Sequence, residues 1–236
     1  MRVGPYTLGS LVHVIKRGAR GMPIVNDDED RWRFVRSLYL LNDEYSDTNW
    51  HRDTATLQIF ERPAHWPERK PIVRVLSWTL LSNHFHLLLQ ETEDGGISRF
   101  MQRVGGSMSL CFNLKYRSQG SIFQSAYKGR TVDKDAYLRY LVSYLLVKNV
   151  FEMYPGGIRK AMREFDTAWN WATTYPFSAL PHYVSGKNTP IVDDSDKLIM
   201  NIISNERVFK KEARDTLRRL AETDGGDLKS LMLEPW

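Results

Sequence analysis

The sequence predicts an α+β fold built around an antiparallel sheet. Two apolar stretches rich in strand-forming residues are separated only by a turn at Leu81–Asn83, as in antiparallel neighbours. Amphipathic helical patterns occur between the strand patterns, and no internal repeat is visible. The strand patterns cover residues 10–17, 72–80, 82–89 and 121–132, and the helical patterns cover residues 28–45, 97–115, 134–150 and 159–173.

The composition is that of an ordinary globular protein of 236 residues, with 42% hydrophobic and 26% charged residues. This length suits one domain with an appendage, or two small domains. No apolar run approaches the roughly 18 residues that span a bilayer, and the first residues lack the apolar core of a signal peptide. The single cysteine, Cys111, cannot form an internal disulfide or a zinc cluster. We therefore expect a cytoplasmic protein.

Positive charge is concentrated in the middle of the chain. The net charge is +5, but residues 95–163 hold twelve lysines and arginines against three acidic residues. A basic region of this kind favours a polyanionic partner such as nucleic acid. For any single lysine, a solvated helix face is the alternative.

The first half of the chain combines regular elements with one long connection. The first strand ends at a turn over Gly18–Gly21, and Asn26 or Asp27 caps the helix that follows. Residues 46–70 are polar and contain prolines, which predicts an irregular connection interrupted by a short strand near residues 57–60.

The second half is mainly helical. Gly105 and Gly106 stand in the middle of the helix at 97–115 and predict close packing or a kink there. Asp133 is expected to cap the helix at 134–150. Residues 181–193 are expected to form a loop, and residues 194–223 two helices, of which the second is strongly basic.

Two histidines, His84 and His86, stand on one face of the strand at 82–89. Side chains alternate along a strand, so the two imidazoles lie about 7 Å apart at Cβ and can converge on one divalent cation. The alternative is a pair of surface or hydrogen-bonded histidines. His13 can face the same site, although a half-buried strand histidine is the simpler interpretation. The opposite face carries apolar residues that fix the direction of the pair: Phe85, Leu87 and Leu89.

A tyrosine stripe follows the helix at 134–150. Tyr140, Tyr144 and Lys148 fall within about 80° of one another at helical spacing. A lysine beside a tyrosine favours the phenolate, so this pair is a candidate nucleophile above the histidine face. Amphipathic packing at a border between sheet and helix is the alternative.

Several stretches, in this order, resemble the single-tyrosine transposases of the His-hydrophobic-His (HUH) superfamily, in particular the REP-associated tyrosine transposases. The resemblance covers about residues 8–180. The stretches are His13–Gly18, Leu81–Leu89, Gly95–Arg103, Phe112–Tyr116, Gly120–Gln124, Tyr137–Tyr144 and Tyr175–Ser178.

The resemblance implies a ferredoxin-like core, with an antiparallel sheet of four or five strands and helices packed on one side. It also implies that His84 and His86 bind Mg²⁺ or Mn²⁺ and that Tyr144 is the nucleophile. The substrate would be single-stranded DNA held next to a hairpin, nicked and joined through a 5′-phosphotyrosine link. We accordingly expect a transposase-like domain over residues 1–180 and a loop and basic helical extension over residues 181–236, as a monomer or a homodimer.

The sequence departs from the family at one position. The family often has a polar metal ligand four residues after the tyrosine, where this chain has Lys148, a cation. Asn149 follows at five residues, about 140° around a regular helix from Tyr144. A bulge or an unwound last turn would bring Asn149 into the site. Otherwise the third ligand is water or another residue, or Lys148 contacts the phosphate directly.

Basic residues near these motifs are candidates for phosphate contact. Trp169 and Trp171 are candidates for stacking on unpaired bases, with core packing as the alternative. The basic C-terminal helix is a candidate for gripping the hairpin, with a solvated face as the alternative. The candidate DNA-binding residues are Arg99, Arg103, Lys115, Arg117, Lys128, Arg130 and Lys148.

Three functions are thus compatible with the sequence. The first is a metal-dependent enzyme that nicks and joins single-stranded DNA. The second is a domesticated protein that binds a DNA hairpin without turnover. The third is a protein that binds or processes RNA.

Overall fold

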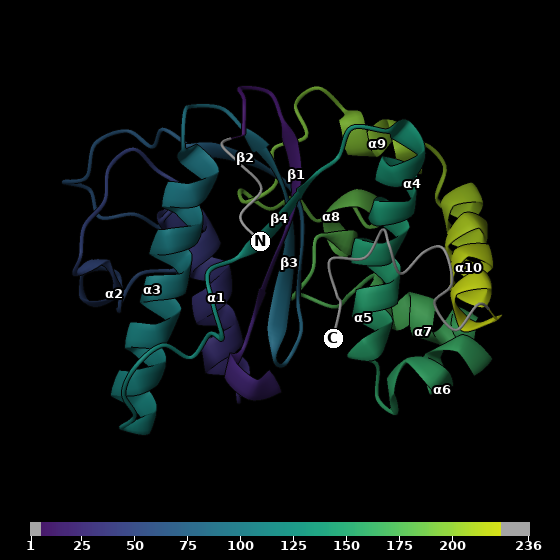
Figure 1. Cartoon of the computed structure of the whole chain (residues 1–236), viewed down its shortest axis with the longest axis horizontal. Coiled ribbons are helices and arrows are strands. Elements are labelled where there is room, and N and C mark those ends of the chain that lie inside the picture. Colours follow the sequence, from purple (N-terminus) through teal and green to yellow (C-terminus); the bar gives the residue numbers. More distant parts are fainter. Residues whose placement is uncertain (1–5, 223–236) are drawn as a thin grey trace.

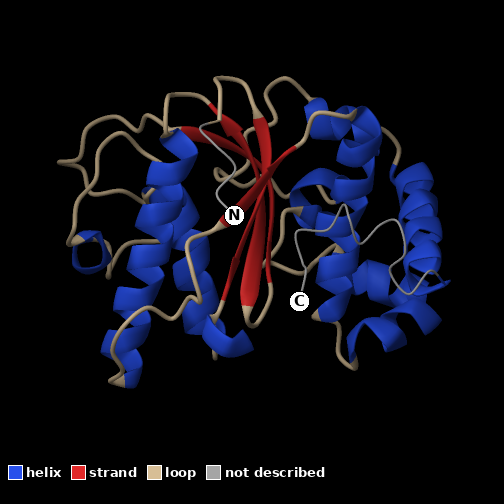
Figure 2. Ribbon diagram, viewed as in Figure 1, coloured by secondary structure: helices blue, strands red, loops and turns tan. Residues whose placement is uncertain are grey.

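The computed structural model describes residues 6–222, in which a four-stranded antiparallel sheet lies between two layers of helices (Figures 1 and 2). The predicted α+β class and central antiparallel sheet are confirmed. Helices cover both faces of the sheet, so the one-sided packing implied by the resemblance is wrong. The strands, in sheet order β2-β3-β1-β4, are Val73–Leu80 (β2), His84–Glu91 (β3), Leu11–Arg17 (β1) and Lys128–Thr131 (β4).

The two layers of helices come from different parts of the chain. Helices α1 (Asp28–Leu40) and α3 (Gly96–Tyr116) cover one face. The other face is covered by α4 (Asp135–Ser143) and its continuation through the π-helical turn η2 (Tyr144–Lys148) into α5 (Asn149–Glu152). The remaining elements are the 3₁₀ turn η1 (Ala19–Gly21), α2 (Trp50–Asp53), α6 (Gly157–Arg163), α7 (Phe165–Ala172), α8 (Leu180–Val184), α9 (Leu198–Ile203) and α10 (Glu206–Glu222).

Strand β3 divides its side chains between the two layers, as predicted. Phe85 lies on the α1 side, where its ring centroid is 4.9 Å from that of Phe34. His86 lies on the other side, 5.7 Å in centroid distance from Tyr144 of η2. Because side chains alternate along the strand, neighbouring residues of β3 face an apolar core on one side of the sheet and a polar site on the other.

Two predicted strand segments are irregular in the structure. Residues 57–60 form no strand, because Arg36 takes the carbonyls of Leu57, Gln58 and Ile59 as hydrogen-bond acceptors. The strand expected at 121–132 is present only as β4. In the segment before β4, the Phe123 amide donates to the hydroxyl of Ser121, and such a local serine bond competes with pairing in a sheet.

Three helix predictions also need correction. Helix α1 ends at Leu40 rather than at residue 45. Asp133 does not cap α4, whose N-cap is Lys134 without a side-chain hydrogen bond. The helix expected at 159–173 is broken into α6 and α7 at Glu164, whose φ of −115° and ψ of 49° are not helical. The loop expected at 181–193 contains the short helix α8.

The C-terminal segment packs against the rest of the chain. Helix α10 lies against α4 and η2. Arg74 of β2 forms ion pairs with Asp193 and Asp196, and the Asp193 amide donates to the carbonyl of Val75. The division of the chain near residue 180 stays a prediction. The expected segment beyond residue 222 lies outside the described residues.

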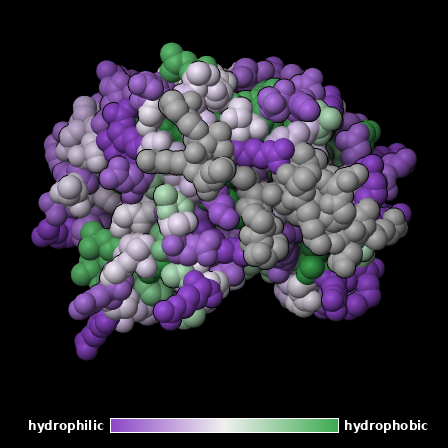
Figure 3. Space-filling model, viewed as in Figure 1, coloured by the Kyte–Doolittle hydropathy of each residue, from purple (hydrophilic) through white to green (hydrophobic). Residues whose placement is uncertain are grey.

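The surface is mostly hydrophilic in the view of Figure 3, with small apolar areas, one of which lies over α3. This helix carries two exposed leucines, Leu110 and Leu114. No helix within residues 6–222 has the length and apolar character required to cross a membrane.

Asn42 joins the end of α1 to the start of β2. Its buried Nδ2 donates to the Val73 carbonyl, and its Oδ1 accepts from the amides of Ile72 and Val73. Asn42→Ala is expected to lower the free energy of unfolding by about 3 kcal/mol, because it leaves buried backbone groups without partners. Urea denaturation measures this. The matched change at the exposed Asn170 of α7 should stay within about 0.5 kcal/mol of the wild type, and an equal loss there would contradict the assignment.

Candidate active site

His84 and His86 lie side by side on β3, with ring centroids 5.0 Å apart. Both are buried, and His86 is fully enclosed. His84 Nδ1 is 2.6 Å from Asn83 Oδ1, and the Nδ2 of Asn83 donates to the Gly21 carbonyl, which assigns the amide oxygen to the His84 side. His84 Nδ1 therefore carries the proton, and Nε2 carries the lone pair that a metal ion requires.

His13 of β1 contacts His86 directly. Its Nε2 is 2.9 Å from His86 Nδ1, and the two rings stack with centroids 5.2 Å apart. When His86 is the donor in this bond, its Nε2 carries the lone pair. Metal-binding histidines are commonly oriented in this way by a partner on the other ring nitrogen. The sequence left open whether His13 faces the histidine pair or is a half-buried strand residue outside the site. In the structure its ring lies against His86.

The helix above the histidines is not regular. Its segment Tyr144–Lys148 is π-helical, and the Asn149 amide donates to the carbonyl of Tyr144, five residues earlier. A bond of this kind adds a residue to the turn, so Asn149 comes to lie on the Tyr144 side of the helix instead of 140° away. This is the bulge that the sequence requires if Asn149 is to reach the site.

A hydrogen bond from the sheet supports this turn. Thr79 of β2 pairs with His86 of β3 in the sheet register. The Thr79 hydroxyl donates to the carbonyl of Leu145 in η2, and both groups are buried. The side chain next to His86 thus holds the turn that carries Tyr144.

Tyr144 is packed between the histidine pair and a lysine. Its ring meets the His86 ring at 75°. Lys148 Nζ donates to the Tyr144 hydroxyl at 3.2 Å and lies 4.6 Å from the centroid of its ring. The ammonium also forms an ion pair with Glu152. This contact places a cation on the oxygen that would carry negative charge as a phenolate.

Asn149 is fully buried, and neither Oδ1 nor Nδ2 has a hydrogen-bond partner among the described residues. Each buried polar group without a partner costs about 1–3 kcal/mol. Native structures rarely keep such a group, and an unfilled ligand position is one reason to do so.

These donors fit a divalent cation. Two imidazoles and an amide oxygen are nitrogen and oxygen ligands, which Mn²⁺ accepts and which Mg²⁺ accepts through oxygen and water. Within residues 6–222, no group of three or more His, Cys, Asp or Glu side chains is arranged to hold a metal. An ion would therefore depend on His84, His86 and Asn149, completed by water.

Two of the predicted DNA-binding residues share the histidine face. Lys128 and Arg130 of β4 pair with Ile15 and His13 of β1, so they point to the same side as the imidazoles. The Arg130 guanidinium lies 4.8 Å from the centroid of the Tyr137 ring. Because β4 is an edge strand, these cations stand between the site and the open edge of the sheet.

Most of the other predicted DNA-binding residues form ion pairs or hydrogen bonds within the protein. Lys115 joins an ion cluster with Asp27, Glu29 and Asp30 of the α1 N-terminus. The remaining three lie on or next to α3. They are Arg103, which donates to the carbonyls of Leu41 and Asp43, Arg99, which pairs with Glu93, and Arg117, which ends α3 in the left-handed conformation.

The aromatic and C-terminal candidates make contacts with one another and with their neighbours in the C-terminal part of the chain. Trp169 is buried, and its Nε1 donates to Glu206 of α10. Trp171 stacks on Tyr175, with ring centroids 4.7 Å apart. In the basic helix α10, Lys210 and Arg214 pair with Asp166 of α7.

Sequence reasoning missed Thr79 as a part of the site. The predicted turn at Leu81–Asn83 would have placed Thr79 opposite Phe85. In the structure the Leu81 amide donates to the His84 carbonyl, and Thr79 lies opposite His86. What no pattern could give is the bond from Thr79 to a helix 66 residues later in the chain.

Comparison with known proteins agrees with the resemblance found in the sequence. Residues 59–147 match the family model "Transposase IS200 like", and this segment contains His84, His86 and Tyr144. A solved structure described as a REP-associated tyrosine transposase bound to a REP hairpin is similar at 14% identity, covering 81% of this chain and 88% of that one, with a TM-score of 0.45. No curated protein gives a significant match. Residues 59–147 are thus similar to IS200-like transposases, in agreement with the resemblance found in the sequence.

Asn149 offers a test of whether the site is built for a ligand. Asn149→Leu keeps the number and branching of the side-chain heavy atoms and removes two buried polar atoms without partners, so without metal the free energy of unfolding should stay equal or rise by about 1–2 kcal/mol. Thermal unfolding in EDTA measures this. A loss of more than about 2 kcal/mol, as expected for a bonded amide such as Asn42, would contradict it.

Proposed function

We propose that this chain, whose residues 59–147 belong to the IS200-like transposase family, nicks and joins single-stranded DNA beside a hairpin in a divalent-metal-dependent reaction. The observation that carries the proposal is the packing of Tyr144 on His86, with Lys148 on the phenol oxygen. The arrangement combines a nucleophile, a stabilising cation and a metal-ligand pair at one place on the sheet.

Each residue has a role that follows from its contacts. The Tyr144 oxygen attacks the scissile phosphorus in line and forms a 5′-phosphotyrosine bond, while the 3′ oxygen leaves as a hydroxyl. The phenol proton passes to water, and Lys148 stabilises the phenolate that remains. His84, His86 and Asn149 would hold Mg²⁺ or Mn²⁺, which would supply Lewis-acid polarisation of the phosphate.

The substrate proposal follows from the charge around the site. Lys128 and Arg130 stand on the same face as the histidines and can contact phosphates on either side of the reacting bond. The phosphotyrosine bond keeps the energy of the broken phosphodiester, so a second 3′-hydroxyl can reverse the step and join strands. We place this activity in the cytoplasm, as a monomer or a homodimer.

A hairpin-binding protein without turnover is the second candidate. Two observations favour it. Lys148 occupies the position where the family often has a neutral ligand, and Tyr144 of η2 is only 3% exposed. Such a protein would keep the basic face and lose the need for an accessible phenol.

The enzyme is expected to form a covalent adduct with DNA. Incubation with Mn²⁺ and single-stranded oligonucleotides from palindromic repeats beside its gene should give a protein–DNA band that survives denaturing electrophoresis. Tyr144→Phe, His84→Ala and EDTA should each abolish this band. Tyr140→Phe, on the same helix, should retain it. Hairpin binding without any adduct in the wild type would favour the second candidate.

Lys148 is expected to act on the rate of this step. Lys148→Met removes the charge beside the phenol oxygen and should slow adduct formation by about 10²-fold. Lys148→Arg keeps the charge and should restore part of the rate. Single-turnover kinetics at saturating DNA separates this effect from binding. An unchanged rate in Lys148→Met would remove the lysine from the mechanism.

A further inference from the structure

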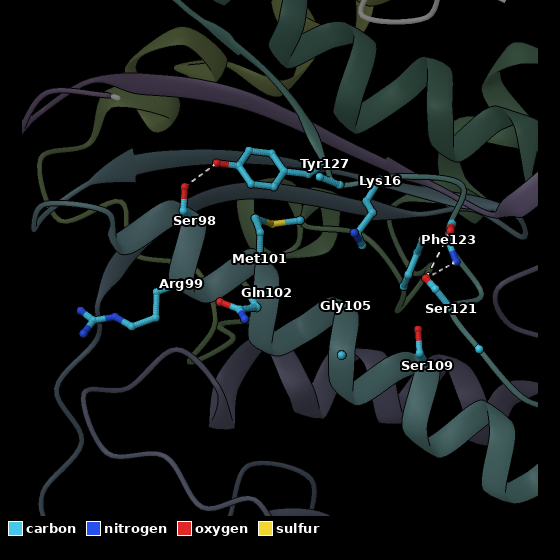
Figure 4. A pocket seen from close by; sticks show the side chains of 13 residues that line it. Lys16, Ser98, Arg99, Met101, Gln102, Gly105, Ser109, Ser121, Phe123 and Tyr127 are labelled. Carbon is cyan, nitrogen blue, oxygen red and sulfur yellow. Dashed lines mark hydrogen bonds between the residues drawn. The ribbon is translucent and has the colours of Figure 1, made fainter. Parts of the chain in front are cut away.

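A cavity of about 800 Å³ lies on the sheet face opposite the histidines, between α3 and the segment that leads into β4 (Figure 4). Its size falls within the range of about 300–1,000 Å³ that is usual for ligand sites. The Ser98 hydroxyl and the Tyr127 phenol, joined at 2.9 Å, lie toward one end, and Ser121 lies toward the other. None of these residues takes part in the proposed reaction.

Lys16 and Arg99 are the charged side chains among the described residues that line this cavity, and Arg99 is paired with Glu93. Lys16 belongs to β1 and pairs with Phe85, so it points away from the histidine face. Its Nζ lies 4.6 Å from the centroid of the Phe123 ring and donates to the Ser125 carbonyl at 3.1 Å. Burial lowers the pKa of this ammonium. Among the described residues, no carboxylate forms an ion pair with Lys16.

The middle of α3 is shaped around this lysine. A Cβ on Gly105 would lie 2.6 Å from Lys16 Cε, so only glycine leaves room for the lysine at this point. A Cβ on Gly106 would meet nothing within 4 Å. Of the close packing or kink predicted for Gly105 and Gly106, the structure shows close packing. Helix α3 continues through both residues.

Of the other polar groups of the cavity, Arg99 is charged and forms an ion pair with Glu93, and the rest are neutral. Ser98, Ser109 and Ser121 contribute hydroxyls, and Gln102 contributes an exposed amide. Hydroxyls and amides donate to and accept from both phosphates and base edges. A half-buried cation without a carboxylate is stabilised by an anion that the cavity can admit. A cation that no carboxylate pairs, among hydroxyls, an amide and aromatic rings, is a suitable setting for a nucleotide.

We propose that this cavity binds an unpaired nucleotide of the DNA strand that flanks the hairpin, with its phosphate on Lys16 Nζ. The inference rests on the proposed function, because it takes single-stranded DNA as the substrate. It adds a second contact region for that strand, on the far side of the edge strand β4 from Tyr144.

The test uses two fluorescein-labelled probes, an oligothymidine of about eight nucleotides and a blunt DNA hairpin of generic sequence. Fluorescence anisotropy gives the affinity of the full chain for each across a salt series. Lys16→Met should weaken oligothymidine binding about tenfold and reduce the magnitude of its salt slope by about 0.7, the value for one phosphate on a single strand. Hairpin affinity should not change.

Three controls make the result specific. Lys187→Met removes the same charge from an exposed position remote in sequence and should change neither affinity. Gly105→Ala displaces the flexible end of Lys16 and should reproduce the loss, whereas Gly106→Ala, one residue along, should not. Circular dichroism and thermal unfolding establish that each variant is folded.

The proposal is overturned if Lys16→Met binds oligothymidine with wild-type affinity and salt slope. It is equally overturned if both probes lose affinity together, since Lys16 would then contact duplex DNA. The proposed function is tested separately. If the adduct forms normally but Lys16→Met leaves oligothymidine binding unchanged, only the cavity proposal is refuted. If oligothymidine binding depends on Lys16 but no adduct forms, only the proposed reaction is refuted.

Discussion

The enclosure of His86 is the constraint on which the rest of the site depends. This imidazole is fully buried and contacts His13 from β1, His84 from its own strand and Tyr144 from η2. Thr79, its neighbour on β2, holds the carbonyl of Leu145. Three strands and one helix therefore meet at a single ring. A shift of any of them by one residue would move a polar group into the apolar core or remove one from the site.

The sequence predicted the strand that carries His84 and His86, because alternation and the short hairpin turn leave little freedom. It also identified Tyr144 and Lys148 as neighbours. It did not predict Tyr144–Lys148 as π-helical, because a π turn depends on tertiary bonds such as the one from Thr79. Local competition explains the errors elsewhere. Ser121 takes the Phe123 amide that a strand would have used, and Arg36 takes the carbonyls expected in a strand near residue 58.

Two buried asparagines illustrate the difference between residues that stabilise the fold and residues that are available for function. Asn42 makes three hydrogen bonds to the backbone of Ile72 and Val73 and contributes to stability. Asn149 is equally buried and has no hydrogen-bond partner in the described part of the chain. The π turn that carries it also departs from regular helical bonding. Such costs, concentrated beside the phenol and the imidazoles, are typical of a functional site rather than of a packing core.

Strand β1 connects the two sites that we assign to DNA. His13 and Lys16 are three residues apart, so they point to opposite faces of the sheet, one toward His86 and the other into the cavity beside α3. Beyond β1 lies only β4, four residues long, with Lys128 and Arg130 on its histidine side. A flexible, negatively charged strand can pass around so short an edge, whereas a rigid duplex cannot bend over it without a large deformation cost. The arrangement of charge on β1 and β4 is thus compatible with the unpaired DNA that we propose as the ligand of this edge.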